Sequence, residues 1–518
     1  MKKLILIFCV GAFSALAMAP INFWPALFVG LSSLYICLCK TKTPSKAAMA
    51  GFMFSLGYFG FSLAWVGNAL LIEDNPYVWA WPLAVSGLPA LLSLFTAIGC
   101  YVYKALYKDA NNVTSYVAFV TCLFISEYAR GHLLTGFPWN LYGYTWIDIL
   151  PIAQVASLSS IYLLTLVTIF WASAPAFLLT SQHNKVMKAF ITIILISSAA
   201  LSYMYGAKRI HDNPVQYNDD YEIIIIQPNI AQSEKWKPEN RGKNFVDQIE
   251  LSKYQASETE SDALTHYIIW PETALSQDIM DTQWAMAYIR NMLRGYSGEA
   301  YLITGALRYD REQEAYFNSV ITFNSNAEII HTYDKSHLVP FGEYMPFENI
   351  VDIAPIVGFS GFKQGGGKVT LTTPEGIKFS PLICYEIIFP NKVIENTAPR
   401  PDMIVNLTND GWYGDSPGPY QHLVQSQFRA IETGIPILRS ANTGISAIIS
   451  PLGEILTIKT ILQKGKVSGN LPYAIIGFFS GFYTENVIIL LLISFLAFIN
   501  ICTKLANYSV LHRNVTKR

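Results

Sequence analysis

The first 206 residues consist of long apolar runs separated by short polar loops. About 20 mostly apolar residues in a helix are enough to cross the hydrocarbon core of a bilayer. Uncharged runs of this kind lie at 4–20, 21–39, 47–72, 77–103, 149–180 and 189–206, with a shorter one at 113–126. The last apolar block, 472–502, contains Glu485, so we expect an interfacial segment at 472–484 and a spanning helix at about 485–503. The pattern therefore predicts eight transmembrane helices.

Basic residues cluster at every second boundary of these runs. In membrane proteins such clusters mark the cytoplasmic side of short loops. The clusters are Lys2/Lys3, Lys40/Lys42/Lys46, Lys104/Lys108, Lys185/Lys188 and Lys504/Arg513/Lys517/Arg518. We therefore expect both termini in the cytoplasm and residues 207–471 on the opposite side of the membrane.

The first run also resembles a secretory signal peptide, because two lysines precede it and Ala17-Met18-Ala19 resembles a cleavage site. Cleavage would make Pro20 the first mature residue, which disfavours processing. It would also disturb the regular alternation of basic loops. We therefore interpret the run as a membrane anchor.

The composition agrees with a membrane protein. Hydrophobic residues make up 52% of the 518 residues and charged residues only 14%, against about 25% charged residues in an average soluble protein. The net charge of −1 gives no reason to expect nucleic acid or another polyanion as a partner. The bilayer is the partner that the composition favours.

Residues 207–471 have the composition of a soluble domain, with regular charges and short β-rich runs. Several of these runs are almost continuously apolar, which is typical of strands covered on both faces. We expect strands at 221–227, 267–270, 301–304, 319–323, 379–384, 403–406, 435–440 and 445–449, and helices at 244–258, 282–296 and 420–433. This alternation predicts an α/β layered domain, inserted between a membrane domain at 1–206 and a last membrane segment with a cytoplasmic tail at 472–518.

Cys384 is the one cysteine of seven that lies outside the strongly apolar stretches. It directly follows a predicted buried strand. The other six lie in or beside apolar runs, where cysteine usually packs as a small hydrophobic residue. An oxidising exterior normally pairs or eliminates free thiols, so a lone thiol there is a candidate nucleophile.

Two further segments place polar side chains where predicted strands end. Glu272 follows the run 267–270, and Lys335 follows Tyr333-Asp334. In open α/β sheets, ligands bind beyond the carboxyl ends of strands, so Glu272, Lys335 and Cys384 can converge. A carboxylate can accept the thiol proton, and an ammonium favours the thiolate and stabilises an oxyanion.

Other catalytic patterns do not fit the sequence. The segment 358–362 lacks the last glycine of a serine-hydrolase elbow, and Gly367-Lys368-Val369 lacks the spacing of a phosphate-binding loop. The histidines show no metal-ligand spacing, and Cys384 has no second thiolate nearby in sequence. We therefore expect neither a metal nor another cofactor, and we expect His337 and His422 to form hydrogen bonds or pack.

Three motifs carry a resemblance to the nitrilase, or carbon–nitrogen hydrolase, superfamily. They are Trp270-Pro271-Glu272-Thr273, Asp334-Lys335 with His337-Leu338-Val339-Pro340-Phe341-Gly342-Glu343, and Cys384-Tyr385-Glu386. Further family-like stretches are 227–229, 408–414, 429–432, 441–444 and the loop 136–139. Together with the predicted topology, the whole chain resembles the apolipoprotein N-acyltransferases, a membrane-bound family of that superfamily.

The resemblance implies an αββα sandwich and a role for each motif residue. Cys384 would be the nucleophile, Glu272 the general base, and Lys335 the group that stabilises the tetrahedral intermediate. Glu343 would support Lys335, and Tyr385 and Glu386, which flank the thiol, would order the site.

The resemblance also implies the substrates and the compartment. The acyl donor would be a phospholipid, and the acceptor the α-amino group of a diacylglyceryl-modified cysteine at the N-terminus of a lipoprotein. The chain would then lie in a bacterial inner membrane with its catalytic domain on the periplasmic side.

Aromatic residues near the predicted membrane surface are candidates for the walls or lid of an acyl site. They are Trp139, Trp236 and Trp412, together with the apolar segment 350–362; an interfacial aromatic belt is the alternative. Glu127 and Arg130 either contact lipid headgroups or pair with each other.

Two other functions are compatible with parts of this pattern. A membrane-tethered amidase or nitrilase would use Glu272, Lys335 and Cys384 in the same way and pass the acyl group to water. A transporter with a degenerate binding domain would need polar residues within the spans, and these are nearly absent. The resemblance to the N-acyltransferases makes acyl transfer to an amine the leading hypothesis.

Overall fold

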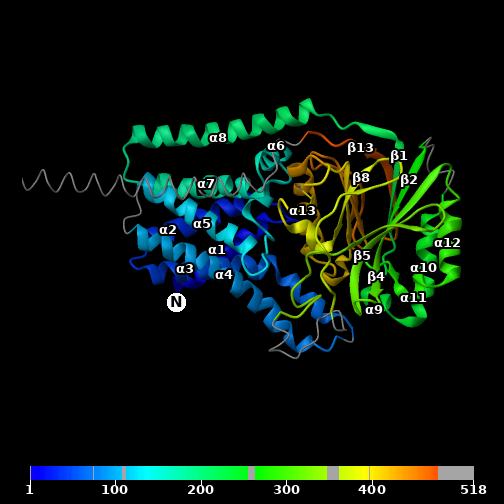
Figure 1. Cartoon of the computed structure of the whole chain (residues 1–518). Helices are drawn as coiled ribbons and strands as arrows, with labels where there is room; N and C mark the ends of the chain where they lie inside the picture. Colours follow the sequence, from blue (N-terminus) through cyan, green and yellow to red (C-terminus); the bar gives the residue numbers. More distant parts are fainter. Residues whose placement is uncertain are drawn as a thin grey trace, which may run out of the picture.

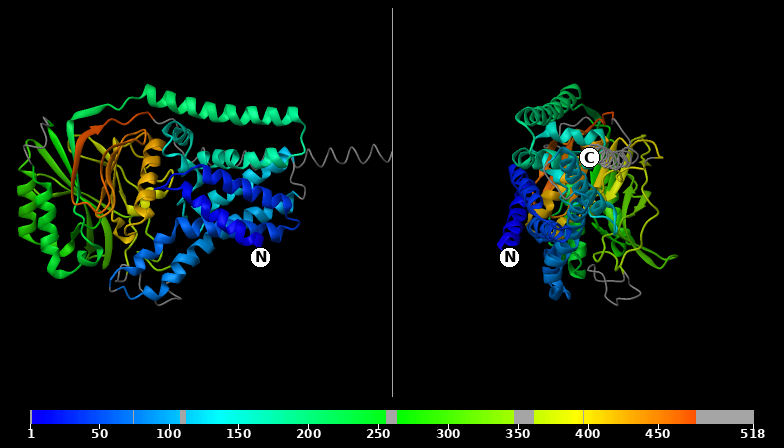
Figure 2. Two further views of the ribbon diagram at one scale, coloured as in Figure 1. Left: turned by 180° about the vertical axis from the view of Figure 1, so that it is seen from behind. Right: turned by 90° about the vertical axis from the view of Figure 1, so that its left-hand side faces the viewer.

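The computed structural model describes residues 2–73, 75–107, 112–254, 263–346, 361–395 and 397–476. The N-terminal part forms a bundle of helices, and the part that follows forms two β-sheets with helices on their outer faces (Figure 1). The sandwich packs against one end of the bundle, as the view from behind also shows (Figure 2).

Each apolar run predicted before residue 206 contains a helix. The helices are α1 (Lys2–Ser14), α2 (Pro25–Lys40), α3 (Pro44–Ser62), α4 (Trp81–Leu106), α5 (Val113–His132), α6 (Leu150–Ala153), α7 (Ile161–Thr180) and α8 (Lys185–Asp212). The run 149–180 is broken near its start, where short turns between α6 and α7 precede the long helix. The predicted eighth helix at 485–503 and most of the interfacial segment 472–484 lie outside the described residues.

Three helices in the described part of the chain are long and apolar enough to cross a bilayer: 78–106, α7 and α8. A fourth candidate combines α3 with the 3₁₀ helix Ala64–Leu71, which are bent by 47° relative to each other. Helix α2 is apolar but shorter. Helix α8 lies along the side of the bundle, and the most apolar part of it is unburied (Figure 1).

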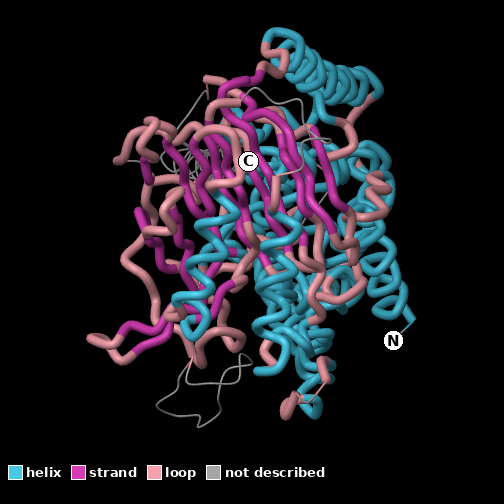
Figure 3. The backbone as a smooth tube through the Cα atoms, turned by 90° about the vertical axis from the view of Figure 1, so that its right-hand side faces the viewer, coloured by secondary structure: helices cyan, strands magenta, loops and turns pink. Residues whose placement is uncertain are grey.

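The strands form two sheets (Figure 3). The first sheet has seven strands in the order β13-β1-β2-β4-β5-β6, with β3 paired to β4, and the second has six in the order β12-β11-β10-β9-β8-β7. The strands of the first are β1 (Tyr217–Gln227), β2 (Thr265–Ile269), β3 (Leu275–Ser276), β4 (Glu299–Asp310), β5 (Ala315–Phe323), β6 (Ile329–Asp334) and β13 (Gly465–Pro472). Those of the second are β7 (Leu371–Thr372), β8 (Lys378–Ile383), β9 (Met403–Thr408), β10 (Ile437–Ala441), β11 (Ser446–Ile449) and β12 (Ile455–Lys459).

Alternate residues of the central strands face different cores. Ile223 and Ile225 of β1 pack between the sheets, against residues such as Val405 of β9. Ile224 and Ile226 face outward, towards α10 (Pro238–Ser252) and α12 (Gln283–Leu293). Since both faces are covered, the buried stretch 223–226 of β1 is apolar at every position. With helix α13 (Pro417–Thr433) on the outer face of the second sheet, the layers form the predicted αββα sandwich.

Helix α13 (Pro417–Thr433) lies between the second sheet and the helical bundle (Figure 1). Ser416 caps its start by accepting a hydrogen bond from the Gly418 amide, and it ends at Gly434, which has the left-handed conformation that favours glycine. One hydrophobic cluster joins residues of α13 and the second sheet to the bundle. The sandwich is therefore seated on the bundle through a shared core.

The predicted strands are all present, with small differences at their ends, and so are the three predicted helices. Helix α10 begins six residues before the predicted 244 and ends at Ser252; the end of the predicted 244–258 lies partly outside the described residues. Helix α13 begins at Pro417, earlier than 420, because proline is favoured in a first helical turn. The prediction expected a strand to end at Tyr333-Asp334, as β6 does, but gave no range for it; it missed β3, β7, β12 and β13 and the short helices α9 (Gln232–Lys235) and α11 (Gln277–Met280).

Candidate active site

The predicted site residues meet at one edge of the sandwich. Strands β2, β4 and β6 run in the same direction, because β5 is antiparallel to both β4 and β6. Glu272 follows β2 and Lys335 follows β6, while Cys384 follows β8 of the other sheet. Glu272 lies 3.8 Å from the Lys335 ammonium, and both side chains act electrostatically on the Cys384 thiol. The structure therefore brings the three residues together, and their catalytic roles stay a prediction.

Lys335 lies between two carboxylates in the interior. Its ammonium donates a hydrogen bond to Glu343 at 2.8 Å and lies 3.8 Å from the nearer oxygen of Glu272. Asn318 of β5 donates to both carboxylates, at 2.8 Å to Glu272 and 3.0 Å to Glu343. Burial lowers the pKa of Lys335, but Glu343, Glu272 and Cys384 outweigh it and hold the pKa above its usual range. Lys335 is therefore a permanent positive charge.

A tight turn presents Glu272 to this cluster. Thr273 has a left-handed backbone with φ of 48°, and the turn lies directly over Gly305 of β4. A Cβ at position 305 would come within 2.6 Å of the Glu272 Cα and of the Pro271 carbonyl oxygen. Glycine is needed there because the two backbones approach so closely.

Cys384 sits on a sharp bend directly after β8. Its backbone φ is 47°, a conformation that is uncommon for residues other than glycine, and its side chain is buried. Glu386 holds the bend by accepting a hydrogen bond from the Ile383 amide at 2.8 Å. Such strained conformations cluster at functional sites.

Glu386 is the centre of a buried network behind the nucleophile. Its carboxylate accepts hydrogen bonds from the Tyr333 hydroxyl, the Ser336 amide and hydroxyl, and the ammonium of Lys368. Burial raises the pKa of Glu386, but Lys368 and these donors have the larger, opposite effect and lower the pKa to about 2. Glu386 therefore braces the Cys384 bend as a permanent anion.

We expect Glu386→Gln to lower the free energy of unfolding by about 3 kcal/mol, because an amide leaves the partly buried Lys368 without its counter-charge. The folded pKa is below the ordinary 4.5, so the stabilisation is present above that pH and is lost as pH falls towards 2. In thermal unfolding of the purified proteins, the Tm of the variant should be below that of wild type at pH 7, and this difference should become smaller at acid pH. The exposed Glu454→Gln is the matched control; a Glu386→Gln Tm equal to wild type at pH 7 would contradict the bracing role.

The thiol of Cys384 is protonated in the resting site. Burial raises its pKa to about 12, Glu272 and Asp410 raise it too, and Lys335 acts in the opposite direction. A thiol in this state needs a base at the moment of reaction. Glu272 is close enough to influence the thiol electrostatically and is placed to be that base.

A second buried network supports the backbone of Cys384. His422 of α13 bonds to the Cys384 carbonyl at 3.2 Å and to Asp410 at 2.9 Å. Arg439 of β10 donates to Asp410 at 2.8 Å, and with His422 it holds the Asp410 pKa at about 2 despite burial. The prediction that His422 forms hydrogen bonds is confirmed.

Sequence comparisons agree with this geometry. A family model described as carbon–nitrogen hydrolase matches residues 225–465, and one described as the apolipoprotein N-acyltransferase N-terminal domain matches residues 10–205. The apolipoprotein N-acyltransferase of Rhodopseudomonas palustris is 35% identical over 489 residues, covering 91% of this chain and 90% of that protein. This chain belongs to the apolipoprotein N-acyltransferase family.

Other N-acyltransferases of the family are similar to the same extent. That of Rhizobium rhizogenes is 35% identical over 491 residues, covering 91% of this chain and 90% of its own length. Among solved structures, Saccharomyces cerevisiae Nit3, of the nitrilase superfamily, aligns with a TM-score of 0.37 and 15% identity, covering 48% of this chain and 89% of that chain. Both halves of the chain are thus accounted for by N-acyltransferase relatives.

Aromatic residues predicted near the acyl site of this N-acyltransferase lie in different surroundings. Trp139 is buried where the bundle meets α13, donates to Gln421 at 2.9 Å and packs against Trp65. Trp236 and Trp412 are partly exposed. Most of the predicted lid segment 350–362 lies outside the described residues. Of the three tryptophans, Trp139 thus joins the two parts of the molecule.

Tyr385 also connects the two parts, and the charged pair of α5 holds the loop that Tyr385 contacts. The Tyr385 hydroxyl donates to the Gly136 carbonyl at 3.1 Å. Arg130 pairs with Glu127 at 2.7 Å and donates to the Trp139 carbonyl at 2.9 Å, and both charged side chains are buried. Of the two alternatives for Glu127 and Arg130, the structure therefore shows mutual pairing.

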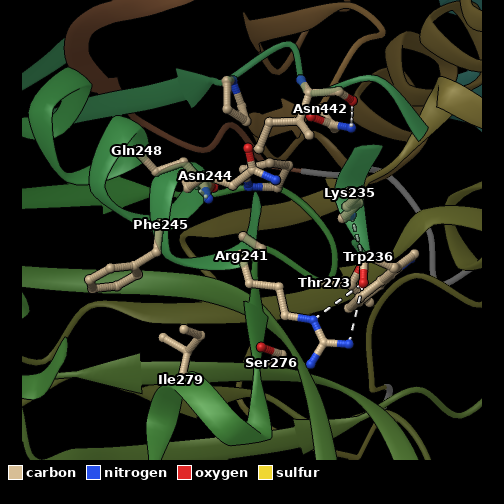
Figure 4. A pocket seen from close by; sticks show the side chains of 14 residues that line it. Lys235, Trp236, Arg241, Asn244, Phe245, Gln248, Thr273, Ser276, Ile279 and Asn442 are labelled. Carbon is tan, nitrogen blue, oxygen red and sulfur yellow. Dashed lines mark hydrogen bonds between the residues drawn. The ribbon is translucent and has the colours of Figure 1, made fainter. Parts of the chain in front are cut away.

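Sequence reasoning missed Lys235 and Asn318 as members of the site. Lys235 ends α9 beside a pocket that Trp236, Arg241 and Thr273 also line (Figure 4). Its ammonium donates to the Glu272 carbonyl at 2.9 Å and to the Thr273 hydroxyl at 2.7 Å. No motif singles out either residue; the adjacent Trp236 and the family-like stretch 227–229 were the nearest signals.

The described residues contain no group of three or more His, Cys, Asp or Glu side chains arranged to hold a metal ion. What the site does contain is the thiol of Cys384, the carboxylates of Glu272 and Glu343, and the ammonium groups of Lys335 and Lys235. These groups suffice for acyl transfer through a covalent thioester.

Proposed function

We propose that this chain transfers a fatty acyl chain from a membrane phospholipid to the α-amino group of the N-terminal diacylglyceryl-cysteine of lipoproteins. The acyl chain is carried as a thioester on Cys384. The observation that supports this most directly is Lys335, held between Glu272 and Glu343 beside the Cys384 bend. Family membership supplies the donor and acceptor classes.

In the first half-reaction, Glu272 accepts the thiol proton and the Cys384 sulfur attacks the carbonyl carbon of the phospholipid ester. The carbonyl oxygen becomes an oxyanion, which Lys335 stabilises. The ester C–O bond then breaks, and Glu272 returns the proton to the leaving oxygen. The products are a lysophospholipid and an acyl-Cys384 thioester.

In the second half-reaction, the amine nitrogen of the lipoprotein attacks the thioester carbonyl. Glu272 accepts a proton from the nitrogen, and Lys335 again stabilises the oxyanion. The C–S bond breaks as the amide forms, and the Cys384 sulfur regains a proton. The scheme balances without a cofactor.

The membrane part keeps the site at the bilayer surface. Moving an acyl chain into water costs about 0.8 kcal/mol for each CH₂, so the site must meet the donor where it lies. In the proposed topology, eight spanning helices at 1–206 and about 485–503 carry the catalytic domain 207–471 on the periplasmic side of a bacterial inner membrane. Both termini are then cytoplasmic, and Trp236 and Trp412 form part of the acyl site.

A competition for the acyl group tests this function against a membrane-tethered amidase that uses water. Purified enzyme is given a phospholipid with a labelled acyl chain and a synthetic diacylglyceryl lipopeptide with a free or an acetylated N-terminus. We expect labelled lipopeptide with the free amine only, and little free fatty acid. Release of fatty acid at the same rate with either lipopeptide would show that water is the acceptor and would contradict acyl transfer.

A further inference from the structure

Lys235 is a buried lysine that lies beside the general base and has a fixed position. Its side chain is 8% exposed. Helix α9 is tied down at its other end, where Gln232 accepts a hydrogen bond from Asn409 at 2.7 Å. Asn442 also holds the preceding loop through both hydrogen bonds to the Ile230 backbone, at 3.0 and 2.8 Å. These contacts place the Lys235 ammonium against the Glu272–Thr273 turn.

The charge of Lys235 is not matched by a contact with a carboxylate. In the described part of the chain its hydrogen-bond acceptors are the Glu272 carbonyl and the Thr273 hydroxyl, and its third neighbour is the Trp236 ring at 5.5 Å. Burial lowers its pKa to about 8, against the opposing effect of Glu272 and Cys384. A buried cation is costly unless it stabilises a negative charge.

The charges of the site show which negative charge Lys235 offsets. Glu272, Glu343 and Lys335 form one cluster, and two carboxylates with one ammonium leave a net charge of −1. Asp410 is already paired with Arg439. With Lys235 the charges of the cluster sum to zero. Without it, Cys384 would have to ionise beside a net negative cluster.

We propose that Lys235 is a positioning residue of the acyl-transfer site, which fixes the Glu272–Thr273 turn and supplies the second positive charge beside Cys384. When Glu272 accepts the thiol proton, the negative charge moves from the carboxylate to the sulfur. Lys335 is then still bound to Glu343, and Lys235 balances the new thiolate. This inference rests on the proposed function only in taking Cys384 and Glu272 as the reacting groups.

Lys235→Met tests the proposal because methionine fills a similar volume without a charge or a donor. We expect acyl-Cys384 formation from a defined phospholipid at pH 7.5 to slow about tenfold to hundredfold. We also expect the alkylation of Cys384 by iodoacetamide to need a higher pH than in wild type. The other groups that act on this thiol are the same in both proteins: Glu272, Lys335, Asp410, Thr408 and Tyr413.

Two controls separate the charge from the rest of the side chain. Thr273→Val removes one acceptor of Lys235 and keeps its charge, so the pH profile of alkylation should match wild type. Lys237→Met alters a partly exposed lysine that pairs with Glu234 and should change neither rate nor profile. Cys384→Ala gives the background from the other cysteines.

The proposal is overturned if the rate of acyl-Cys384 formation in Lys235→Met is within about twofold of the wild-type rate. It is also overturned if the rate falls together with the Tm while the pH profile of alkylation stays unchanged. The second result would assign Lys235 a purely structural role. Failure of the proposed function has a different signature: wild type would form no thioester on Cys384. The alkylation profiles would still report whether Lys235 acts on the thiol.

Discussion

Cys384→Ala is expected to abolish acyl transfer while the protein still folds. In the proposed scheme the Cys384 sulfur is the only protein atom that bonds to the acyl group between donor and acceptor. Its removal therefore stops both half-reactions. Alanine removes only a sulfur, and the Glu386 network that holds the bend uses backbone and neighbouring side chains. Intact-mass analysis after incubation with a defined phospholipid should show one added acyl chain on wild type and none on the variant, at equal Tm.

Two further variants make the result specific. Cys384→Ser should also show no detectable transfer, because Glu272 is placed to deprotonate a thiol and a hydroxyl is far less acidic. Cys9→Ala alters an exposed cysteine of α1 and should keep full activity. The acyl chain should be released by hydroxylamine at neutral pH, as expected of a thioester. An acyl adduct mapped to any residue other than Cys384 would overturn the assignment of the nucleophile.

Sequence patterns predicted the centre of the sandwich better than its edges. The buried stretches of β1, β2 and β9 are covered on both faces and are rich in apolar residues, as at 223–226 of β1. Strands β6, β12 and β13 lie at or near the sheet edges and are half-exposed, with sequences such as Ile329-Ile330-His331-Thr332-Tyr333-Asp334 and Gly465-Lys466-Val467-Ser468. Solvent-facing polar residues alternate with the apolar ones in these strands, so the sequence alone does not give their bounds.

The catalytic trio was predictable because each member follows a strand within a recognisable motif. Asn318 lies within a strand, and Lys235 lies on a four-residue helix that tertiary contacts hold in place. Their roles depend on contacts between segments far apart in sequence, such as Asn318 with Glu343 and Lys235 with Glu272. Trp139 shows the same limit, since only the packing of α13 on the bundle reveals that it is buried.

Lys335→Met is expected to reduce acyl transfer by more than about 10³-fold, because loss of one oxyanion donor alone costs about 10²–10³. The substitution has a second effect on the base. Without the ammonium, the carboxylates of Glu272 and Glu343 share Asn318 as a donor with no positive charge between them. Two close carboxylates cannot both ionise readily, so a proton bound to the pair at neutral pH would block Glu272 as a base.

The double variant Lys335→Met/Glu343→Gln separates catalysis from charge balance. The single variant should lose about 3–5 kcal/mol of unfolding free energy, because an uncompensated charge stays buried. It should regain part of that as pH falls, since a proton on either carboxylate removes the surplus buried negative charge. Replacing Glu343 removes the surplus negative charge, so the Tm of the double variant at neutral pH should return towards that of wild type. Acyl transfer, measured with labelled phospholipid and lipopeptide, should stay absent. Recovery of transfer together with Tm would show that Lys335 serves only to balance charge, because an oxyanion would then be stabilised without it.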